Sequence, residues 1–332
     1  MHRFFAEDSF WNTPIPTDAR PDPRSDHLVK LLAREPSGGL HLNLPHYTIP
    51  VYEVDETTPL RRVRQRVFLD AQTGKPRTWG GAGRTFSHGA GFDGMVPIPD
   101  YAVPDPADDG HAAFVDWGRG VVWDIFAARI LPDGDWESLT GMKYAAYGRG
   151  WWHPADFPVL DGESIHFHGP GRAAGVPIVA GLVMHEEALA GEIRHKLAFA
   201  CRYSGYKEFV SPPATWTDGQ LVGGLPEGAV IQLDPDLDLG RLDLPPAARA
   251  VARAMQTYGM VNTDWAAANA VYVQGLYYDG APHWEGLLDE WDLRPVPVES
   301  LRVLKMDNVI PKGDARSRGA GITDPAELEK RR

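Results

Sequence analysis

Short apolar runs, separated by turns rich in glycine and proline, make up most of this chain. Alternating or continuous apolar residues predict strands over residues 46–54, 63–69, 95–99, 112–116, 121–126, 163–168, 176–183, 193–201, 228–233, 260–264 and 269–276. The Gly-Arg-Gly turn at 118–120 predicts a hairpin between two neighbouring strands.

Helical periodicity is confined to a few segments. It is clearest over residues 245–258, where apolar residues recur every three or four positions between a proline pair and a closing glycine. A short helix is predicted after Ser25 and ends before Pro36. The acidic pair Glu186-Glu187 predicts the start of a helical turn, because carboxylates favour a helix N-terminus.

Many short strands and few helices predict a mainly β fold, a β-sandwich or jelly-roll-like architecture with a few short helices. Strands and helices do not alternate often enough for a doubly wound parallel sheet. We expect an extended N-terminal arm over residues 1–25, rich in proline, and a single mainly-β catalytic domain over 26–312. Residues 313–332 are expected to form a loose C-terminal tail.

Composition narrows the classes of partner. The chain has 45 Asp and Glu against 33 Lys and Arg, and the net charge of −12 disfavours nucleic acid and anionic lipid. Cys201 is the only cysteine, so an internal disulfide is excluded, and its apolar neighbours predict a buried thiol. The sequence contains neither a membrane-spanning run nor the apolar segment of a signal peptide. We therefore expect a cytoplasmic protein, or a secreted one if the chain is already a trimmed mature form.

The run from Arg172 to Leu182 is apolar and is interrupted by Gly175 and Gly181, shortly after His166 and His168. Glycine accepts positive φ and lets another backbone or a ligand approach closely. This run therefore predicts tight packing beside a site that carries several titratable side chains.

The central part of the chain, about residues 95–285, resembles a family of proteins from actinobacteria and other soil bacteria. The shared pattern corresponds here to residues 173–178 (AAGVPI), 181–182 (GL), 191–197 (GEIRHKL), 254–260 (AMQTYGM) and Asp264. Two departures are Arg172, where the family often carries Asp, and Asp124, where it tends to carry Glu. The resemblance implies one integral domain rather than a particular reaction, and secreted, polymer-facing relatives would be consistent with a glycan-active role.

Three carboxylates in or beside apolar, aromatic segments are candidates for catalysis. Asp124 and Asp264 are the leading pair and Asp93 is held in reserve. Apolar surroundings raise the pKa of a carboxyl group, and two carboxyls across a cleft suit glycoside hydrolysis, one as acid and one as base or nucleophile. The alternative for Asp264 is a turn or cap residue.

Histidines are the second set of candidates. If residues 163–168 form a strand, His166 and His168 share a face, as two metal ligands or an acid–base pair would. His153 would be a third ligand, so a divalent metal is an open alternative to a reaction without a cofactor. His195 lies between Arg194 and Lys196, whose charges would lower its pKa and keep it a neutral proton acceptor, unless it makes only a structural hydrogen bond.

Aromatic and basic side chains complete the expected site, because flat rings stack on sugars and polar groups bind the hydroxyls. The predicted substrate-binding residues are Trp79, Arg84, His88, Trp123, Trp152, His166, Arg172 and Tyr258. The chain has no Gly-x-Ser-x-Gly elbow, no His-Glu-x-x-His motif and no dinucleotide fingerprint.

These features favour an enzyme that cleaves glycosidic bonds of an oligo- or polysaccharide, with a carboxylate pair as a glycoside hydrolase. The acidic surface fits a neutral glycan better than a uronate polymer. One alternative is a polysaccharide lyase, in which His168 or His195 abstracts a proton, Tyr258 protonates the leaving oxygen and Arg84 or Arg172 neutralises the uronate. The others are a non-catalytic carbohydrate-binding module and a metal-dependent hydrolase. The sequence leaves the oligomeric state open.

Overall fold

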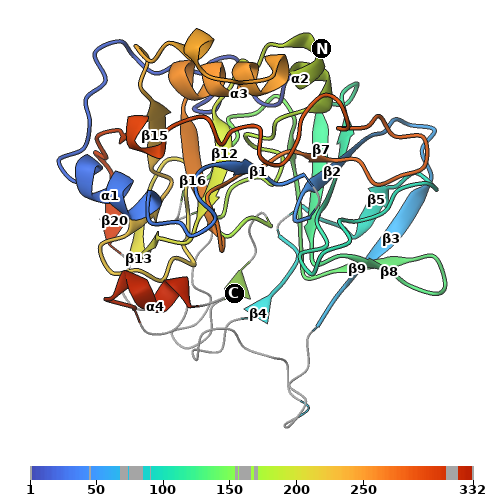
Figure 1. Cartoon of the computed structure of the whole chain (residues 1–332). Helices are drawn as coiled ribbons and strands as arrows, with labels where there is room; N and C mark the ends of the chain where they lie inside the picture. Colours follow the sequence, from blue (N-terminus) through green and yellow to red (C-terminus); the bar gives the residue numbers. More distant parts are fainter. Residues whose placement is uncertain are drawn as a thin grey trace.

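The computed structural model describes residues 2–44, 46–67, 74, 85–89, 91–153, 156, 166–167, 171–311 and 321–330. Over these residues the protein is mainly β, with two large sheets, three small sheets and four short α-helices (Figure 1). The predicted mainly-β, sandwich-like fold is confirmed. No helix in the described ranges is long and apolar enough to cross a membrane.

Two sheets form the body of the molecule. The six-stranded sheet has the order β1 (His41–Leu42), β17 (Ala270–Val271), β12 (Leu197–Cys201), β16 (Met260–Trp265), β15 (Val230–Leu233), β19 (Leu301–Val303). The five-stranded sheet has the order β10 (Thr140–Ala145), β7 (Val121–Phe126), β6 (Ala112–Asp116), β2 (Ile49–Glu53), β18 (Gln274–Gly275).

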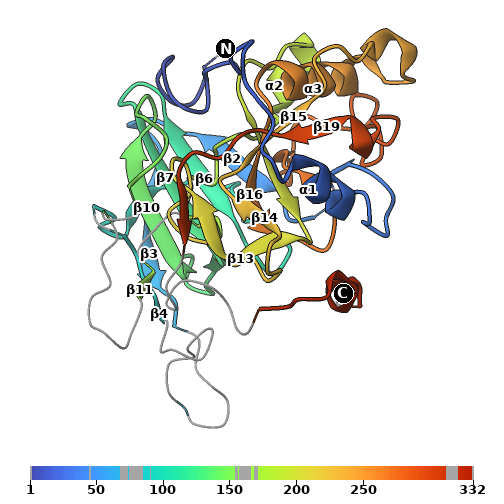
Figure 2. The same ribbon diagram turned by 90° about the vertical axis from the view of Figure 1, so that its left-hand side faces the viewer.

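Smaller sheets and helices surround this body (Figure 2). The small sheets are β5 (Met95–Pro97), β3 (Leu60–Gln65), β9 (Trp136–Ser138), β8 (Arg129–Ile130); β14 (Leu225–Glu227), β13 (Ser204–Val210), β20 (Val309–Pro311); and β11 (His166–Phe167), β4 (Thr85–Phe86). The helices are α1 (Ser25–Leu32), α2 (His185–Ala190), α3 (Pro246–Thr257) and α4 (Pro325–Glu329), with 3₁₀ turns at Leu239–Arg241 and Val298–Ser300. Helices α2 and α3 lie together at one end of the molecule, at the top of Figure 1.

The alternation of side chains along the strands builds three cores. In β12, Ala198 and Ala200 face the five-stranded sheet, while Leu197, Phe199 and Cys201 face the core beneath α1 and α3. In β6, Ala113 and Val115 join the same inter-sheet core, while Phe114 faces a third core with Trp136. Because successive residues of a strand point to opposite faces, strands buried on both sides are continuously apolar.

Several of the predicted helices and strands are confirmed and others are wrong. Strands β6 and β7 have the predicted bounds, and α3 and α1 occur where helical periodicity predicts them. The prediction of one strand over 269–276 is wrong, since β17 and β18 join different sheets, and β12 begins only at Leu197. The predicted strand at 176–183 is also wrong, because this segment consists of turns.

The segment 172–183 nevertheless fills the space between the two large sheets. Its apolar side chains are almost fully buried there, namely Ala174, Val176, Ile178, Val179, Ala180, Leu182 and Val183. Gly175 and Gly181 have φ of +68° and +72°, and a Cβ at Gly181 would lie 2.3 Å from the backbone nitrogen of Ala198. The predicted close packing of this glycine-containing run is therefore confirmed, although its backbone is not a strand.

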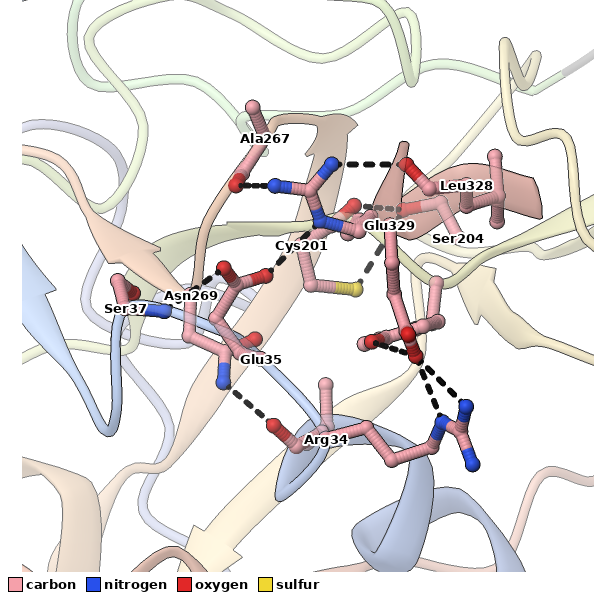
Figure 3. A network of polar contacts seen from close by, with 12 residues as sticks. Arg34, Glu35, Ser37, Cys201, Ser204, Ala267, Asn269, Leu328 and Glu329 are labelled. Carbon is pink, nitrogen blue, oxygen red and sulfur yellow. Dashed lines mark hydrogen bonds and ion pairs between the residues drawn. The ribbon is translucent and has the colours of Figure 1, made fainter. Parts of the chain in front are cut away.

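The C-terminal segment 321–330 packs on the body, so the prediction of a loose tail is wrong for these residues. Leu328 of α4 is fully buried. Arg202 donates from Nη1 to the Leu328 carbonyl (2.9 Å) and pairs through Nε with the Glu35 carboxylate (3.2 Å). Figure 3 labels Glu35, Leu328 and Glu329 in this network. The Glu329 carboxylate accepts hydrogen bonds from Arg34 and from the Tyr203 hydroxyl.

Candidate functional site

The two carboxylates that lead the sequence prediction converge on one guanidinium, that of Arg172. We call Asp124, Tyr144, Arg172, Asp264 and Tyr272 the Arg172 cluster. The Tyr144 hydroxyl donates to Asp124 Oδ2 (3.0 Å) and the Tyr272 hydroxyl donates to Asp264 Oδ2 (3.2 Å). The Arg172 guanidinium lies 4.2 Å from the centre of the Tyr272 ring and interacts electrostatically with both carboxylates.

Strand geometry explains why these side chains meet between the sheets. Asp124 lies opposite Ala113 in the β6–β7 pair, and both face the inter-sheet core, while Trp123 faces the other way. In β16 the pairing with β12 shifts by one residue, so that Phe199 lies opposite Asn262 but Ala200 lies opposite Asp264. This bulge turns Asp264 toward the inter-sheet side, the side that Ala200 faces.

The cluster also fixes the irregular segment between the sheets. Asp124 Oδ2 accepts the backbone N–H of Ile178 (3.2 Å), and Arg172 Nη2 donates to the Ile178 carbonyl (2.5 Å). The other oxygen of Asp124 and Nε of Arg172 are buried and make no hydrogen bond to any described residue. Most buried polar atoms in proteins have a hydrogen-bond partner, so an atom without one calls for an explanation.

Burial shifts the titration of the whole cluster. It raises the pKa of Asp124 to about 7, against the opposing effects of the Ile178 N–H, Tyr144 and Arg172. Burial, together with the neighbouring Asp218 and Asp109, raises the pKa of Asp264 well above its usual range, although part of this side chain reaches solvent. The pKa values of Tyr144 and Tyr272 are raised by burial and by the carboxylates they contact. Both tyrosines therefore remain protonated and act as hydrogen-bond donors.

Two further acids adjoin Asp264. Glu227 is fully buried, and burial, with Asp218 and Asp264 nearby, raises its pKa well above the usual range. Like charges this close cannot all ionise, so protons are shared among these carboxyls. Neither Glu227 nor Asp218 is identified by sequence reasoning, because both follow turns whose pattern is typical of ordinary surface loops. Tyr144, in β10, and Tyr272, directly after β17, are also missed, since the segments around them carry no distinguishing motif.

The raised pKa of Asp124 predicts a pH-dependent stability. The folded protein keeps the Asp124 proton up to about pH 7, whereas the unfolded chain loses it near 3.8. The stabilising contribution is present below the unfolded pKa and is lost as the pH rises toward 7. Asn cannot ionise, so we expect Asp124→Asn to keep its stability as the pH rises. The free energy of unfolding of Asp124→Asn, relative to that of the wild type, should increase by up to about 4 kcal/mol between pH 3.8 and pH 7.

Urea denaturation of both proteins at a series of pH values measures this difference. The exposed Asp236, replaced by Asn, is the control and should show no such trend. A difference between Asp124→Asn and wild type that stays constant with pH would contradict the assignment.

Of the two tryptophans predicted to contact substrate in this region, Trp152 lies beside the Arg172 cluster and Trp123 does not. Trp152 is partly exposed and packs edge-on against the Tyr144 ring, with centroids 5.5 Å apart. Trp123 is 5 % exposed and packs in the third core, on the face of β7 opposite to Asp124. A substrate contact by Trp123 at this site is therefore excluded by the alternation of the strand.

Three other predicted residues do not join the cluster. Tyr258 caps the C-terminal end of α3, and about 13 Å of extended strand, from Met260 to Asp264 in β16, separates it from the cluster. Asp93 is exposed, and its Oδ1 accepts the backbone N–H of Met95 (3.0 Å), so it closes a turn. The His88 ring bonds to Ser138 Oγ (3.0 Å) and packs against Phe92.

His195 lies in a different place from the prediction, and its pKa is shifted in the opposite direction. Its Nε2 lies 3.0 Å from Glu187 Oε2, and its Nδ1 bonds to the Lys196 carbonyl (2.8 Å). Burial alone would lower the pKa of His195, but the Glu187 carboxylate outweighs it and the pKa is raised. The predicted lowering by its sequence neighbours is wrong, because a contact at hydrogen-bond distance outweighs charges that point away. The pair lines a cleft of about 320 Å³ beside α2, which we call the α2 cleft.

Part of the predicted site lies outside the described residues. This holds for Trp79, Arg84 and His168, and for the side chain of His166, whose backbone pairs with Thr85. His153 is exposed. The part of the chain that the structure describes contains no group of three or more His, Cys, Asp or Glu able to hold a metal. The metal site at His153, His166 and His168 stays a prediction.

Cys201 is fully buried, and burial raises the pKa of its thiol to about 12. The prediction of a buried thiol is confirmed. A thiol with this pKa is protonated at neutral pH and is a poor nucleophile.

Comparison of the chain with known protein families, with curated proteins and with solved structures finds no match. The resemblance drawn from the sequence pattern therefore stays a prediction, and any assignment of function depends on the geometry of the site.

Proposed function

We propose that the protein hydrolyses glycosidic bonds of a neutral oligo- or polysaccharide at the Arg172 cluster. The observation that carries the proposal is the meeting of Asp124 and Asp264. They come from strands of different sheets, are about 140 residues apart in sequence, and share one buried guanidinium and a tyrosine each. Two carboxyls with displaced pKa values are the working groups of glycoside hydrolases.

Asp264 is the proton donor in this proposal. Asp264 as a residue is partly exposed, and its raised pKa favours the protonated carboxyl, which can protonate the leaving glycosidic oxygen as the bond to the anomeric carbon breaks. The Tyr272 hydroxyl and the Arg172 guanidinium keep it in place and stabilise the carboxylate that remains.

Asp124 is the second carboxyl and acts through Tyr144, because it is itself fully buried. The attacking water gives its hydroxyl to the anomeric carbon and its proton to the Tyr144 oxygen, while the Tyr144 proton passes to Asp124 over the 3.0 Å hydrogen bond. A pKa of about 7 suits a base at neutral pH. Solvent exchange then returns a proton to Asp264 and removes one from Asp124.

The nature of the substrate follows from the surroundings. Trp152 is partly exposed at the edge of the cluster, where its indole can stack on a sugar ring. The acids Asp264, Asp218 and Glu227 offer a uronate carboxylate no positive charge to bind, which disfavours a uronate polymer.

β-Elimination is supported less well. The lyase mechanism needs an accessible cation for the uronate, but Arg172 is 1 % exposed, and its guanidinium contacts the Tyr272 ring and the Ile178 carbonyl. Two of its residues, His195 and Tyr258, lie away from the cluster, at the end of the sheet near α3.

A panel of neutral and uronate polysaccharides, assayed for new reducing ends and for ultraviolet absorbance of an unsaturated product, tests the proposal. We expect reducing ends from a neutral glycan without a rise in absorbance, because hydrolysis adds water and forms no double bond. A rise in absorbance with a uronate polymer would mean that the protein cleaves by elimination and not by hydrolysis. Reducing ends from neither class would remove the proposed function.

A further inference from the structure

The α2 cleft has a composition suited to a sugar, and the proposed hydrolysis makes no use of it. Its 320 Å³ lies within the range of small-ligand sites. Aromatic side chains form one part of its lining, and carboxylate, imidazole and amide groups form another. The aromatic lining residues are Phe4, Phe5, Trp11, Tyr52, Tyr101, Trp117 and Tyr278.

Three tyrosines build the aromatic wall. Tyr101 and Tyr278 have ring centroids 5.0 Å apart, and both pack against Tyr52, at 6.0 and 5.6 Å. Tyr52 is 2 % exposed and its hydroxyl bonds to the backbone of Val103, so it anchors the other two rings. Tyr101 is 52 % exposed. A ring that is held from behind and open in front is a preformed platform for a sugar face, which lowers the entropic cost of binding.

Polar groups line the same cleft. Glu53 accepts the indole N–H of Trp117 through Oε1 (2.9 Å), and Gln274 accepts the backbone N–H of His185 through Oε1 (3.1 Å). Each of these two hydrogen bonds uses one oxygen atom and holds the side chain in place. Glu186 is exposed at the first turn of α2. Carboxylates and an amide at fixed positions are the groups that take hydrogen bonds from vicinal hydroxyls.

The floor of the cleft is held by the buried Glu187–His195 pair. Glu187 Oε2 accepts from both His195 Nε2 (3.0 Å) and the backbone N–H of Met184 (3.3 Å). Both ring nitrogens of His195 are bonded to the protein, so this residue supports the lining rather than reacting with a ligand.

The cleft and the Arg172 cluster lie at different levels of the six-stranded sheet. Asp264 lies opposite Ala200, whereas His195 comes before β12 begins at Leu197, so about 10 Å of extended strand from Leu197 to Ala200 lies between the two levels. A ligand in the α2 cleft is therefore not the residue being cleaved.

We propose that the α2 cleft is a second, non-catalytic carbohydrate-binding site that holds a neutral glycan by stacking on Tyr101 and by hydrogen bonds to Glu53, Glu186 and Gln274. This inference goes beyond the proposed hydrolysis and does not depend on it. A binding site of this kind keeps a polymer near the enzyme, and in the absence of cleavage it would make the protein a carbohydrate-binding module.

Binding is tested in the Asp264→Asn protein, so that cleavage does not consume the probe. Affinity electrophoresis through gels containing hydroxyethylcellulose, soluble xylan or laminarin, and calorimetry with the matching hexaoses, measure the dissociation constant. We expect at least one of these glycans to retard the protein. We expect Tyr101→Ala to weaken that binding by about tenfold or more, because stacking of one aromatic ring on a sugar is lost.

Tyr47→Ala is the matched control, since Tyr47 is 47 % exposed and does not line the cleft. It should leave the dissociation constant within about twofold. The proposal is overturned if none of the three glycans binds, or if Tyr101→Ala binds as tightly as its parent. Reducing-end assays on the wild-type protein decide the hydrolysis separately, so failure of one proposal is distinguishable from failure of the other.

Discussion

Replacement of Asp264 by Asn is expected to lower the rate of glycan hydrolysis by about 10²- to 10⁴-fold, the contribution typical of a positioned general acid. Asn preserves the shape of the side chain and still accepts the Tyr272 hydroxyl through its amide oxygen, but it has no proton to give to the leaving oxygen. Because the raised pKa of Asp264 costs stability as the pH rises above the pKa of the unfolded chain, a neutral amide should not destabilise the folded protein. The rate of appearance of reducing ends is the measurement.

A substrate with a good leaving group distinguishes a role of Asp264 as proton donor from a structural role. An aryl glycoside whose phenol needs little protonation should be cleaved by Asp264→Asn far closer to the wild-type rate than the natural polymer is. The exposed Asp236, replaced by Asn, should keep full activity on both substrates. Equal losses on both substrates would assign Asp264 a structural role, and undiminished hydrolysis by Asp264→Asn would remove it from the mechanism.

Replacement of Arg202 by Met is expected to lower the free energy of unfolding by about 3–5 kcal/mol, the cost of breaking a buried ion pair. Glu35 is left without its cation in a place where its side chain is 1 % exposed, and the carbonyl oxygens of Leu328 and Ala267 lose their donor (Figure 3). The C-terminal segment should also detach, because Arg202 joins α4 to the rest of the protein. Urea denaturation measures the first effect, and limited proteolysis with mass spectrometry within residues 321–330 measures the second.

Two further variants test whether the expected loss of stability arises from the buried Arg202–Glu35 ion pair or simply from removing a positive charge. Arg194→Met removes an ion pair with Glu192 in which both side chains are more than half exposed, and it should leave stability nearly unchanged because water screens such a pair. The double variant Arg202→Met with Glu35→Leu should recover much of the loss, since no unpaired charge remains buried. If the double variant is no more stable than Arg202→Met, the loss does not arise from the unpaired Glu35 carboxylate.

The Arg172 cluster holds the protein together and, in the proposed reaction, supplies the two carboxyl groups. Stability at neutral pH favours a neutral group at Asp124, whereas the proposed reaction needs an ionisable one. The cluster satisfies the backbone of Ile178 and so holds the segment between the sheets. At the same time, burial raises the pKa of Asp124, which costs stability at neutral pH. A network kept only for stability would gain from a neutral group at this position, so the presence of an ionisable one favours a role in function.

Local errors in the sequence predictions have identifiable causes. The apolar residues of 176–183 fit a strand because periodicity reports burial and not backbone conformation, and a turn-rich segment enclosed by two sheets is equally apolar. His195 has charged neighbours in sequence, yet its pKa is raised by Glu187, eight residues away, which only the α2 turn brings within 3.0 Å. In both cases the deciding contact is absent from the local sequence.

The amino-acid sequence alone determined the mainly β character of the protein, the faces of strands such as β6 and β7, the limits of α3 and the choice of Asp124 and Asp264, because these depend on side-chain period and on local polarity. The meeting of the two carboxylates was decided by tertiary structure. A one-residue shift in pairing with β12 turns Asp264 toward the inter-sheet space, and Arg172 reaches it from an irregular segment that no period describes. Such a register depends on how neighbouring strands pack, and that is a property of the assembled sheets rather than of any single strand.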